Sequence, residues 1–288
     1  MKRVFVLSFI VVALFHLPAY SIDTDPLDFV AGGPGTGVLG LYFGDWNSSQ
    51  QYFDGSLIGN NSISSNYVVG TYVWFHNVGG RVVGTKIVIP VSNVSVFSQD
   101  GGTVSGSGVG DPTLVFPIWL VNKPEKRTYF GVIPRFQLPL GQYDKNNPIN
   151  PGANRFTFAL QPGFTTGLGT KKVSLDLVGD MQFFGKNNDL AGGGSLEQKP
   201  LFSMQTHLNY ELGPGFTASI GAYKYIGGET KTGEEWNKDR TNTNTVIASL
   251  GYWITKQDNF QFQYRADVSP QNGAGFTGIQ IRYLHVFF

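Results

Sequence analysis

Apolar and polar side chains alternate along most of the chain after residue 35, with the period of two that is typical of β-strands. The clearest run covers residues 202–211, where one face carries Phe202, Met204, Leu208 and Tyr210 and the other carries Ser203, Gln205, His207, Asn209 and Glu211. With the turn residues between such runs, the alternation predicts twelve strands, near residues 36–46, 66–75, 81–97, 111–121, 129–140, 155–164, 173–183, 202–211, 216–226, 242–254, 260–268 and 275–288.

The connections between these strands are sorted by length. Those that follow odd-numbered strands are mostly long, near residues 47–63, 98–110, 141–154, 185–199, 227–241 and 269–275. Those that follow even-numbered strands are all short, near residues 77–80, 122–126, 167–170, 213–215 and 255–259. An even number of strands with this sorting predicts a twelve-stranded antiparallel transmembrane β-barrel, with short periplasmic turns and long extracellular loops.

A soluble β-sandwich is the alternative, because it would show the same alternation with the apolar face turned inward. A sandwich has no reason to sort its connections by length. The chain also stops on Phe288, and a terminal aromatic is costly in water but well placed at the boundary of the hydrocarbon layer. We therefore expect lipid outside the barrel and water inside it.

In the last strand each of the two faces mixes apolar and polar residues. Phe288, Val286 and Leu284 share a parity with Arg282 and Gln280, while His285 interrupts the other, apolar parity. A β-bulge between residues 282 and 285 would reconcile the two sets, and we expect one there. We also expect the barrel-assembly machinery to bind this C-terminal strand.

The N-terminus reads as a signal peptide of residues 1–21. Lys2 and Arg3 precede an apolar run over residues 4–17, Pro18 breaks the run, and Ala19 and Ser21 supply small residues for cleavage after Ser21. An N-terminal membrane anchor is the alternative. Residues 22–35 are rich in Gly and Pro and form a periplasmic entry segment, residues 36–288 form the barrel, and the expected location is the outer membrane of a Gram-negative bacterium.

Composition narrows the class of protein further. Charged residues make up 14% of the chain, against about 25% in an average soluble domain. The mean hydropathy is −0.09 and no stretch after residue 20 approaches ~20 apolar residues, which excludes a polytopic helical membrane protein. Without Lys2 and Arg3 the chain has 19 basic and 20 acidic residues, and this balance argues against nucleic-acid binding.

Several short blocks resemble the outer-membrane proteins of the family described as "Putative MetA-pathway of phenol degradation". The blocks are Pro34-Gly35, GVGD at residues 108–111, LPLGQYD at 138–144, GANRF at 152–156, FFGKNN at 183–188 and YKY at 223–225. They occur in the family's order and span nearly the whole mature chain. The resemblance implies a bacterial outer-membrane barrel that acts in transport and is linked by name to the degradation of aromatic compounds.

A barrel of twelve strands encloses a narrow lumen, so the inward side chains are the candidates for function. The polar parities supply Arg135, Arg155, Arg265, Asp176, Asp180, Glu211, Asp267, His207, Tyr129, Tyr223 and Tyr225. The charged groups would set an electric field that selects solutes, or they pair across adjacent strands and fill the barrel. We favour pairing, because an unpaired charge in a narrow lumen has a high desolvation cost. The tyrosines would offer contacts to an aromatic solute, or they pack the lumen or form an interface girdle, which we favour.

These patterns together predict a passive outer-membrane channel for small solutes, apolar and aromatic ones included. One alternative is a non-transporting surface barrel whose long loops bind a partner. The other is an outer-membrane enzyme that uses His207 with Glu211, Asp176 or Asp180. No fixed spacing of metal ligands is present, so we expect no metal and no cofactor.

Overall fold

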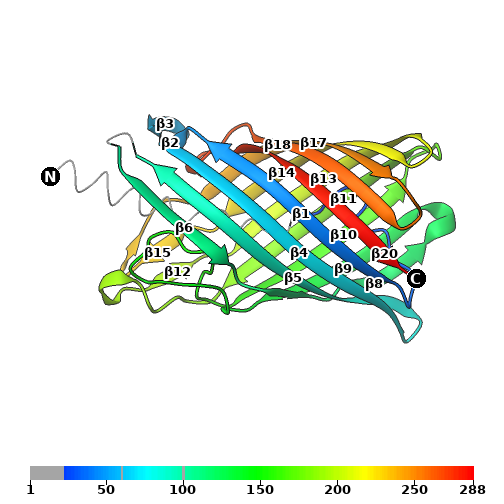
Figure 1. Ribbon diagram of the computed structural model, residues 1–288, viewed down its shortest axis with the longest axis horizontal. Helices are drawn as coiled ribbons and strands as arrows, with labels where there is room; N and C mark the ends of the chain where they lie inside the picture. The colour runs from blue at the N-terminus through cyan, green and yellow to red at the C-terminus, as the bar shows by residue number, and fades with distance from the viewer. Residues whose placement is uncertain (1–22, 60, 99–100) are drawn as a thin grey trace.

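The strands form one closed antiparallel barrel (Figure 1). The computed structural model describes residues 23–288 except residue 60 and residues 99–100, so the predicted signal peptide lies outside the described residues. The barrel strands pair with their neighbours along the chain, and the first strand pairs with the last, which closes the barrel. No helix in the described part of the chain is long and apolar enough to cross a membrane.

The predicted fold class is confirmed, because the barrel has twelve strands. They are β1 (Gly37–Ser48), β4 (Ser62–Val78), β5 (Arg81–Phe97), an interrupted fourth strand composed of β6 (Thr103–Val109), β7 (Thr113–Val115) and β8 (Ile118–Lys123), then β9 (Thr128–Gln137), β10 (Thr157–Gly167), β11 (Val173–Phe184), β13 (Leu201–Gly213), β14 (Phe216–Gly227), β17 (Thr241–Trp253), β18 (Asp258–Asp267) and β20 (Thr277–Phe287).

The barrel is apolar outside and polar inside. On β13 the inward polar side chains from Ser203 to Asn209 are buried, with His207 0% exposed, while Met204 and Leu208 are 72% and 43% exposed. Phe262 on β18 is likewise exposed on the outer face. A water-soluble sheet protein would show the opposite arrangement, so the apolar face of this barrel is the one that meets acyl chains.

The prediction of a loop over residues 98–110 is wrong. Residues 103–109 form β6, which pairs with β5 from Val91↔Val109 to Phe97↔Thr103. The sequence of β6, TVSGSGV, is rich in small polar residues and glycine and therefore lacks the apolar alternation that indicates a membrane strand. Pro112 and Pro117 then interrupt the pairing and divide the fourth strand into three parts, because proline has no N–H to donate.

The predicted bulge in the last strand is also wrong. β20 pairs with β1 from Gly37↔Phe287 to Asn47↔Thr277 without a register shift, and its pairing with β18 is equally regular. Arg282 points into the barrel and His285 lies on the opposite parity. His285 Nδ1 lies 2.8 Å from Asp258 Oδ1, and this pairing near the end of the barrel explains why a polar residue is tolerated on that parity.

One end of the barrel carries short turns and the other carries long loops with small sheets. At the short-turn end, β4 and β5 are joined by Gly79 and Gly80, which both have positive φ angles. At the long-loop end, β2 (Gln51–Phe53) pairs with β3 (Ser56–Gly59) and β19 (Gly273–Ala274). A second sheet joins β12 (Leu196–Gln198), β15 (Thr230–Thr232) and β16 (Glu235–Trp236). The rest of the predicted sorting of connections is therefore confirmed.

The outward face of β13 gives a test of the membrane position. Leu208 lies near the middle of the strand and Leu212 near its short-turn end, on the same face. We expect Leu208→Arg to lower the free energy of unfolding in lipid vesicles by about 2–4 kcal/mol, because it places a cation at the depth of the acyl chains. Leu212→Arg is the matched control and should cost less than about 1 kcal/mol. Equal costs in denaturant titrations would contradict this orientation in the bilayer.

Candidate functional site

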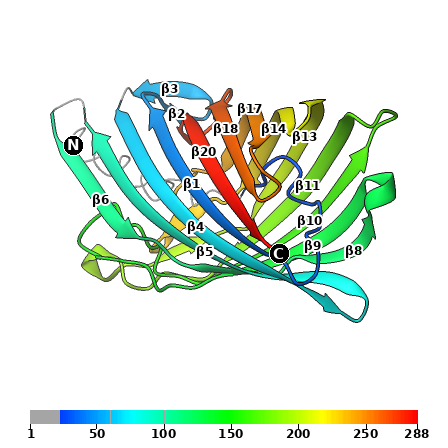
Figure 2. The same ribbon diagram turned by 45° about the vertical axis from the view of Figure 1, so that its right-hand side comes forward.

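The segment that precedes β1 lies inside the barrel (Figure 2). Residues 23–36 form turns and no helix or strand, because Pro26, Pro34 and three glycines interrupt any regular pattern. This segment was expected at the periplasmic side of the barrel. We call residues 23–31 the N-terminal plug, since these residues bond to side chains that point into the lumen from at least five strands.

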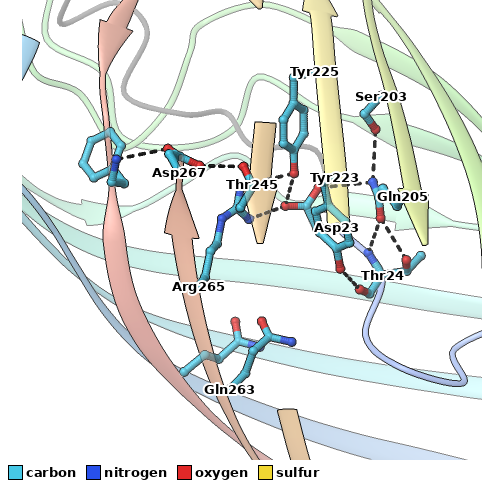
Figure 3. Close-up of polar contacts among 12 residues, drawn as sticks. Asp23, Thr24, Ser203, Gln205, Tyr223, Tyr225, Thr245, Gln263, Arg265 and Asp267 are labelled. Atoms are coloured by element: carbon cyan, nitrogen blue, oxygen red, sulfur yellow. Dashed lines mark hydrogen bonds and ion pairs between the residues drawn. The ribbon is translucent and has the colours of Figure 1, made fainter. Parts of the chain in front are cut away.

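Asp23 ties the beginning of the plug to the barrel wall. Its carboxylate accepts hydrogen bonds from Arg265 Nη1 at 2.5 Å, from the Tyr225 hydroxyl at 2.7 Å and from Gln205 Nε2 at 3.2 Å (Figure 3). The Arg265 guanidinium also lies over the Trp46 ring, 4.9 Å from its centroid. A buried charge is stabilised only when it is paired and its other donors are satisfied, and this cluster provides the pairing.

Thr24 continues the attachment through its main chain. Its N–H and its hydroxyl both donate to Gln205 Oε1, at 2.9 and 2.8 Å. Its carbonyl oxygen accepts a hydrogen bond from the Tyr223 hydroxyl at 2.5 Å (Figure 3). The same oxygen lies 3.1 Å from His207 Nε2. The His207 ring therefore takes part in holding the plug.

Asp25 binds the adjacent part of the wall, on β18 and β20. Its carboxylate accepts hydrogen bonds from Arg282 Nη1 at 2.9 Å and from Gln261 Nε2 at 2.9 Å, with Gln263 Nε2 at 3.3 Å. Asp28 adds a longer ion pair of 3.6 Å to the same Arg282. Two wall arginines are thus neutralised by acidic residues of the plug rather than by residues of neighbouring strands.

Phe29 gives the plug an apolar anchor. Its ring is 1% exposed and packs in a cluster with Val88, Val115, Ile133 and Val178. Its carbonyl oxygen accepts a hydrogen bond of 2.8 Å from Trp119 Nε1. A Cβ at Gly163 on β10 would lie 2.1 Å from the Phe29 ring, so the absence of a side chain at residue 163 makes room for the anchor. Burial of the ring contributes roughly 1.5–3 kcal/mol.

The described residues line two cavities in the lumen. The lower cavity, of about 510 Å³, reaches towards the short-turn end, where Phe75, Trp253 and Phe288 line it. The upper cavity, of about 400 Å³, reaches towards the long-loop end, where Trp46 and Phe276 line it. The cavities share six lining residues, which form the constriction between them: Asp23, Thr24 and Asp28 of the plug, Tyr42 of β1, Thr71 of β4 and Lys86 of β5.

Comparison with known proteins places this barrel in a family. The model of the family described as "Putative MetA-pathway of phenol degradation" matches residues 46–283. The chain belongs to this family. The resemblance drawn from the short sequence blocks is therefore confirmed.

Solved structures of outer-membrane proteins are similar to this member of the phenol-degradation family. The COG4313 outer membrane channel from Pseudomonas putida F1 is 25% identical, with a TM-score of 0.86 over 92% of this chain and 100% of that one. The transport unit of the autotransporter AIDA-I from Escherichia coli shares only the fold, with 9% identity and a TM-score of 0.59 over 98% and 97% of the two chains. No curated protein matches the chain. The protein is an outer-membrane β-barrel of the channel type.

The structure brings several of the sequence-predicted lumen residues to the plug. Arg265, Tyr223, Tyr225 and His207 bond to Asp23 or Thr24. Asp176 accepts hydrogen bonds from the Leu27 N–H at 2.9 Å, from Thr165 Oγ1 at 2.7 Å and from Asn209 Nδ2 at 2.8 Å. These side chains hold the N-terminal plug in place, a role that the sequence did not suggest.

The other predicted residues lie elsewhere. Arg135 pairs with Asp180, two strands away. Tyr129 packs with Phe75, Val82 and Trp119, and Asp267 accepts a hydrogen bond from Thr245 Oγ1 at 2.6 Å. Glu211 is half-exposed at the short-turn rim, where it pairs with Arg127 at 2.8 Å and therefore does not reach His207. Arg155 lines the upper cavity.

Sequence reasoning did not assign the contacts of the plug and did not predict the constriction. A signal was present, because Asp23, Asp25 and Asp28 fall within six residues just before a barrel whose inward parities carry several arginines. Lys86 was also detectable as a cation on the parity of β5 that otherwise carries Val82 and Val88. Neither pattern indicates which residue the charged side chain contacts, so only the three-dimensional structure assigns these contacts.

The seat of Phe29 gives a test of the plug. We expect Gly163→Ala to loosen residues 24–30, because the new methyl group overlaps the Phe29 ring. Amide hydrogen exchange in this segment should become at least tenfold faster, which corresponds to a fall of about 1.4 kcal/mol in the free energy of local opening. Gly179→Ala on β11 is the matched control, since its Cβ would meet only Pro162 at 3.8 Å. Unchanged exchange in Gly163→Ala would show that Phe29 does not hold the plug.

Proposed function

We propose that the protein is a passive channel through which small solutes, apolar and aromatic ones included, cross between the plug and the wall formed by β1, β4 and β5. The observation that supports this proposal is the constriction, at which the upper and lower cavities touch the same six residues. Each cavity reaches one end of the barrel, so a solute that passes the constriction crosses the membrane.

The polar contacts of the plug lie on other strands, and on β5 the plug touches Val88 through the Phe29 ring. The polar contacts of the plug described above are made with β8, β11, β13, β14, β18 and β20, and none of them is made with β4 or β5. At the constriction the wall presents Tyr42, Thr71 and Lys86 to Asp28 of the plug. Side chains of intermediate size at a passage that borders water select solutes by size and by charge.

The walls of the cavities favour compact solutes with an apolar part. Val73, Phe75, Val115, Trp119 and Ile133 line the lower cavity, and Trp46, Val69, Val88, Val94 and Phe276 line the upper one. Pockets of some hundreds of Å³ with apolar walls and a few polar groups are the usual form of small-molecule sites.

The surface-barrel alternative is favoured by one observation, the presence of residues 23–31 in the lumen. If the plug closes the passage completely, the long loops and their two small sheets become the functional surface. An enzyme receives less support, because His207 bonds to the Thr24 carbonyl oxygen and to the Tyr223 hydroxyl while Glu211 pairs with Arg127 at the rim. Channel and surface barrel are distinguished by conductance.

Substitutions at the constriction test the channel. We expect Thr71→Trp to lower the single-channel conductance in planar bilayers several-fold, because the indole fills the passage, and Tyr42→Ala to raise it, because a ring is removed. Tyr72→Trp is the matched control, since Tyr72 neighbours Thr71 on β4 and points outward. Absence of conductance in the wild-type protein, or equal conductance in all four proteins, would favour the surface barrel.

A further inference from the structure

The upper cavity combines an aromatic wall with a buried cation. Its apolar lining comes from several strands and includes Trp46, Tyr67, Val88, Val94 and Phe276. On the side of the β9–β10 loop the lining changes to polar groups, among them Asn150, Arg155 and Asn187. A cavity of about 400 Å³ with this division suits a small molecule that has an apolar body and one polar end.

Arg155, which precedes β10, is the unusual member of this lining. The residue is 6% exposed, and its guanidinium lies over the Phe184 ring, 4.7 Å from the centroid. Nη2 donates a hydrogen bond to Gln198 Oε1 on β12. Nε and Nη1 are buried and have no hydrogen-bond partner among the described residues. Both atoms are enclosed by protein, so an acceptor in the cavity reaches them only when the Arg155 side chain turns towards it. Buried charged donors without acceptors are costly, and such a turn towards an acceptor would relieve that cost.

Asp111 is the acidic residue that acts on Arg155 electrostatically, but its oxygens are engaged elsewhere. Oδ1 accepts a hydrogen bond from the Gly141 N–H at 2.9 Å, and Oδ2 accepts one from the Ala153 N–H at 2.8 Å and a weaker one from Gln137 Nε2 at 3.3 Å. These bonds fasten the loop that carries Arg155. Asp111 therefore moderates the positive charge of Arg155 without filling its hydrogen bonds.

The remaining cations of this cavity differ from Arg155. Arg265 is bound by Asp23 and by the Tyr225 hydroxyl, and Lys86 lies at the constriction, at the other end of the cavity. Arg155 is thus the cation at the loop side of the cavity, where a solute that enters from the long-loop end arrives first.

We propose that Arg155 binds the carboxylate of a small aromatic monocarboxylate, whose ring lies against the apolar wall of the upper cavity. A carboxylate offers the charged acceptors that Nε and Nη1 lack, and hydrogen bonds between guanidinium and carboxylate are among the strongest in proteins. A single negative charge fits the site, because Asp111 already offsets part of the charge of Arg155. This inference rests on the proposed channel and adds the class of solute.

Benzoate and its neutral analogue benzamide test the site on the full-length protein, refolded in detergent, by isothermal titration calorimetry. We expect wild-type protein to bind benzoate at least about tenfold more tightly than benzamide, as charge-assisted hydrogen bonds to a buried cation predict. Acetate should bind more weakly than benzoate, because it lacks the ring. Arg155→Gln should lose the preference for benzoate over benzamide.

Arg240→Gln is the matched control, since it removes the same charge from an exposed loop at the same end of the barrel. It should bind benzoate as the wild-type protein does. Equal affinity of benzoate for wild type and Arg155→Gln would overturn the proposal. Equal affinity of benzoate and benzamide for the wild-type protein would also overturn it, and this comparison needs no folded variant.

Binding in detergent involves no flow through the barrel, so this experiment is independent of conductance. Benzoate binding by a protein that conducts nothing would support the Arg155 site and refute the channel. Conductance in a protein that does not bind benzoate would support the channel and overturn the carboxylate site.

Discussion

The pairing of buried charges inside the barrel determines how the rest of the lumen is arranged. Arg265 and Arg282 point inward from β18 and β20, and each finds its acidic partner on the N-terminal plug. Removal of either partner would leave an uncompensated charge in a poorly hydrated interior, at a cost of about 3–5 kcal/mol. The wall and the plug are therefore one electrostatic unit, and the shape of the lumen follows from where the plug must lie to satisfy these arginines.

The same constraint explains why the plug fills part of the lumen and leaves cavities in the rest. The plug makes ion pairs and hydrogen bonds with β8, β11, β13, β14, β18 and β20. Its Phe29 ring packs against β5, β7, β9 and β11. Opposite Asp28, the wall offers Tyr42, Thr71 and Lys86, which border open space above and below. A barrel of twelve strands would be a wider tube without the plug, so the plug converts a general pore into two small chambers with distinct linings.

The fold was largely predictable from the sequence, whereas the site was not. The alternation of Phe202, Met204 and Leu208 with polar residues is a local property of the sequence. Membrane strands require it along their length, because successive side chains face lipid and lumen in turn. The two errors arose where this alternation fails. The sequence of β6 lacks apolar alternation, so it predicts a loop instead of a strand. His285 interrupts an apolar face, but its ring pairs with Asp258 and the strand needs no bulge.

The site depends on contacts between residues that are far apart in the chain. Asp23 and Arg265 are separated by 242 positions, and Asp25 and Arg282 by 257. The alternation along the strand predicts that Arg265 points into the lumen. A single sequence contains nothing that pairs Arg265 with Asp23. The same holds for Arg155, whose parity was predictable and whose unused donors become visible only when Asp111 is seen to bond to Gly141 and Ala153.

The plug is joined directly to β1, and this covalent link has a kinetic consequence. A few residues after Phe29, the Gly35 N–H already donates to the Phe75 carbonyl oxygen of β4 at 2.8 Å, so the tether is short. A segment held this close to its binding surface experiences an effective concentration in the millimolar range or above. Excursions of the plug into bulk solvent would therefore be brief and self-reversing, and any widening of the lumen by such an excursion would be seen as short flickers rather than as a lasting open state.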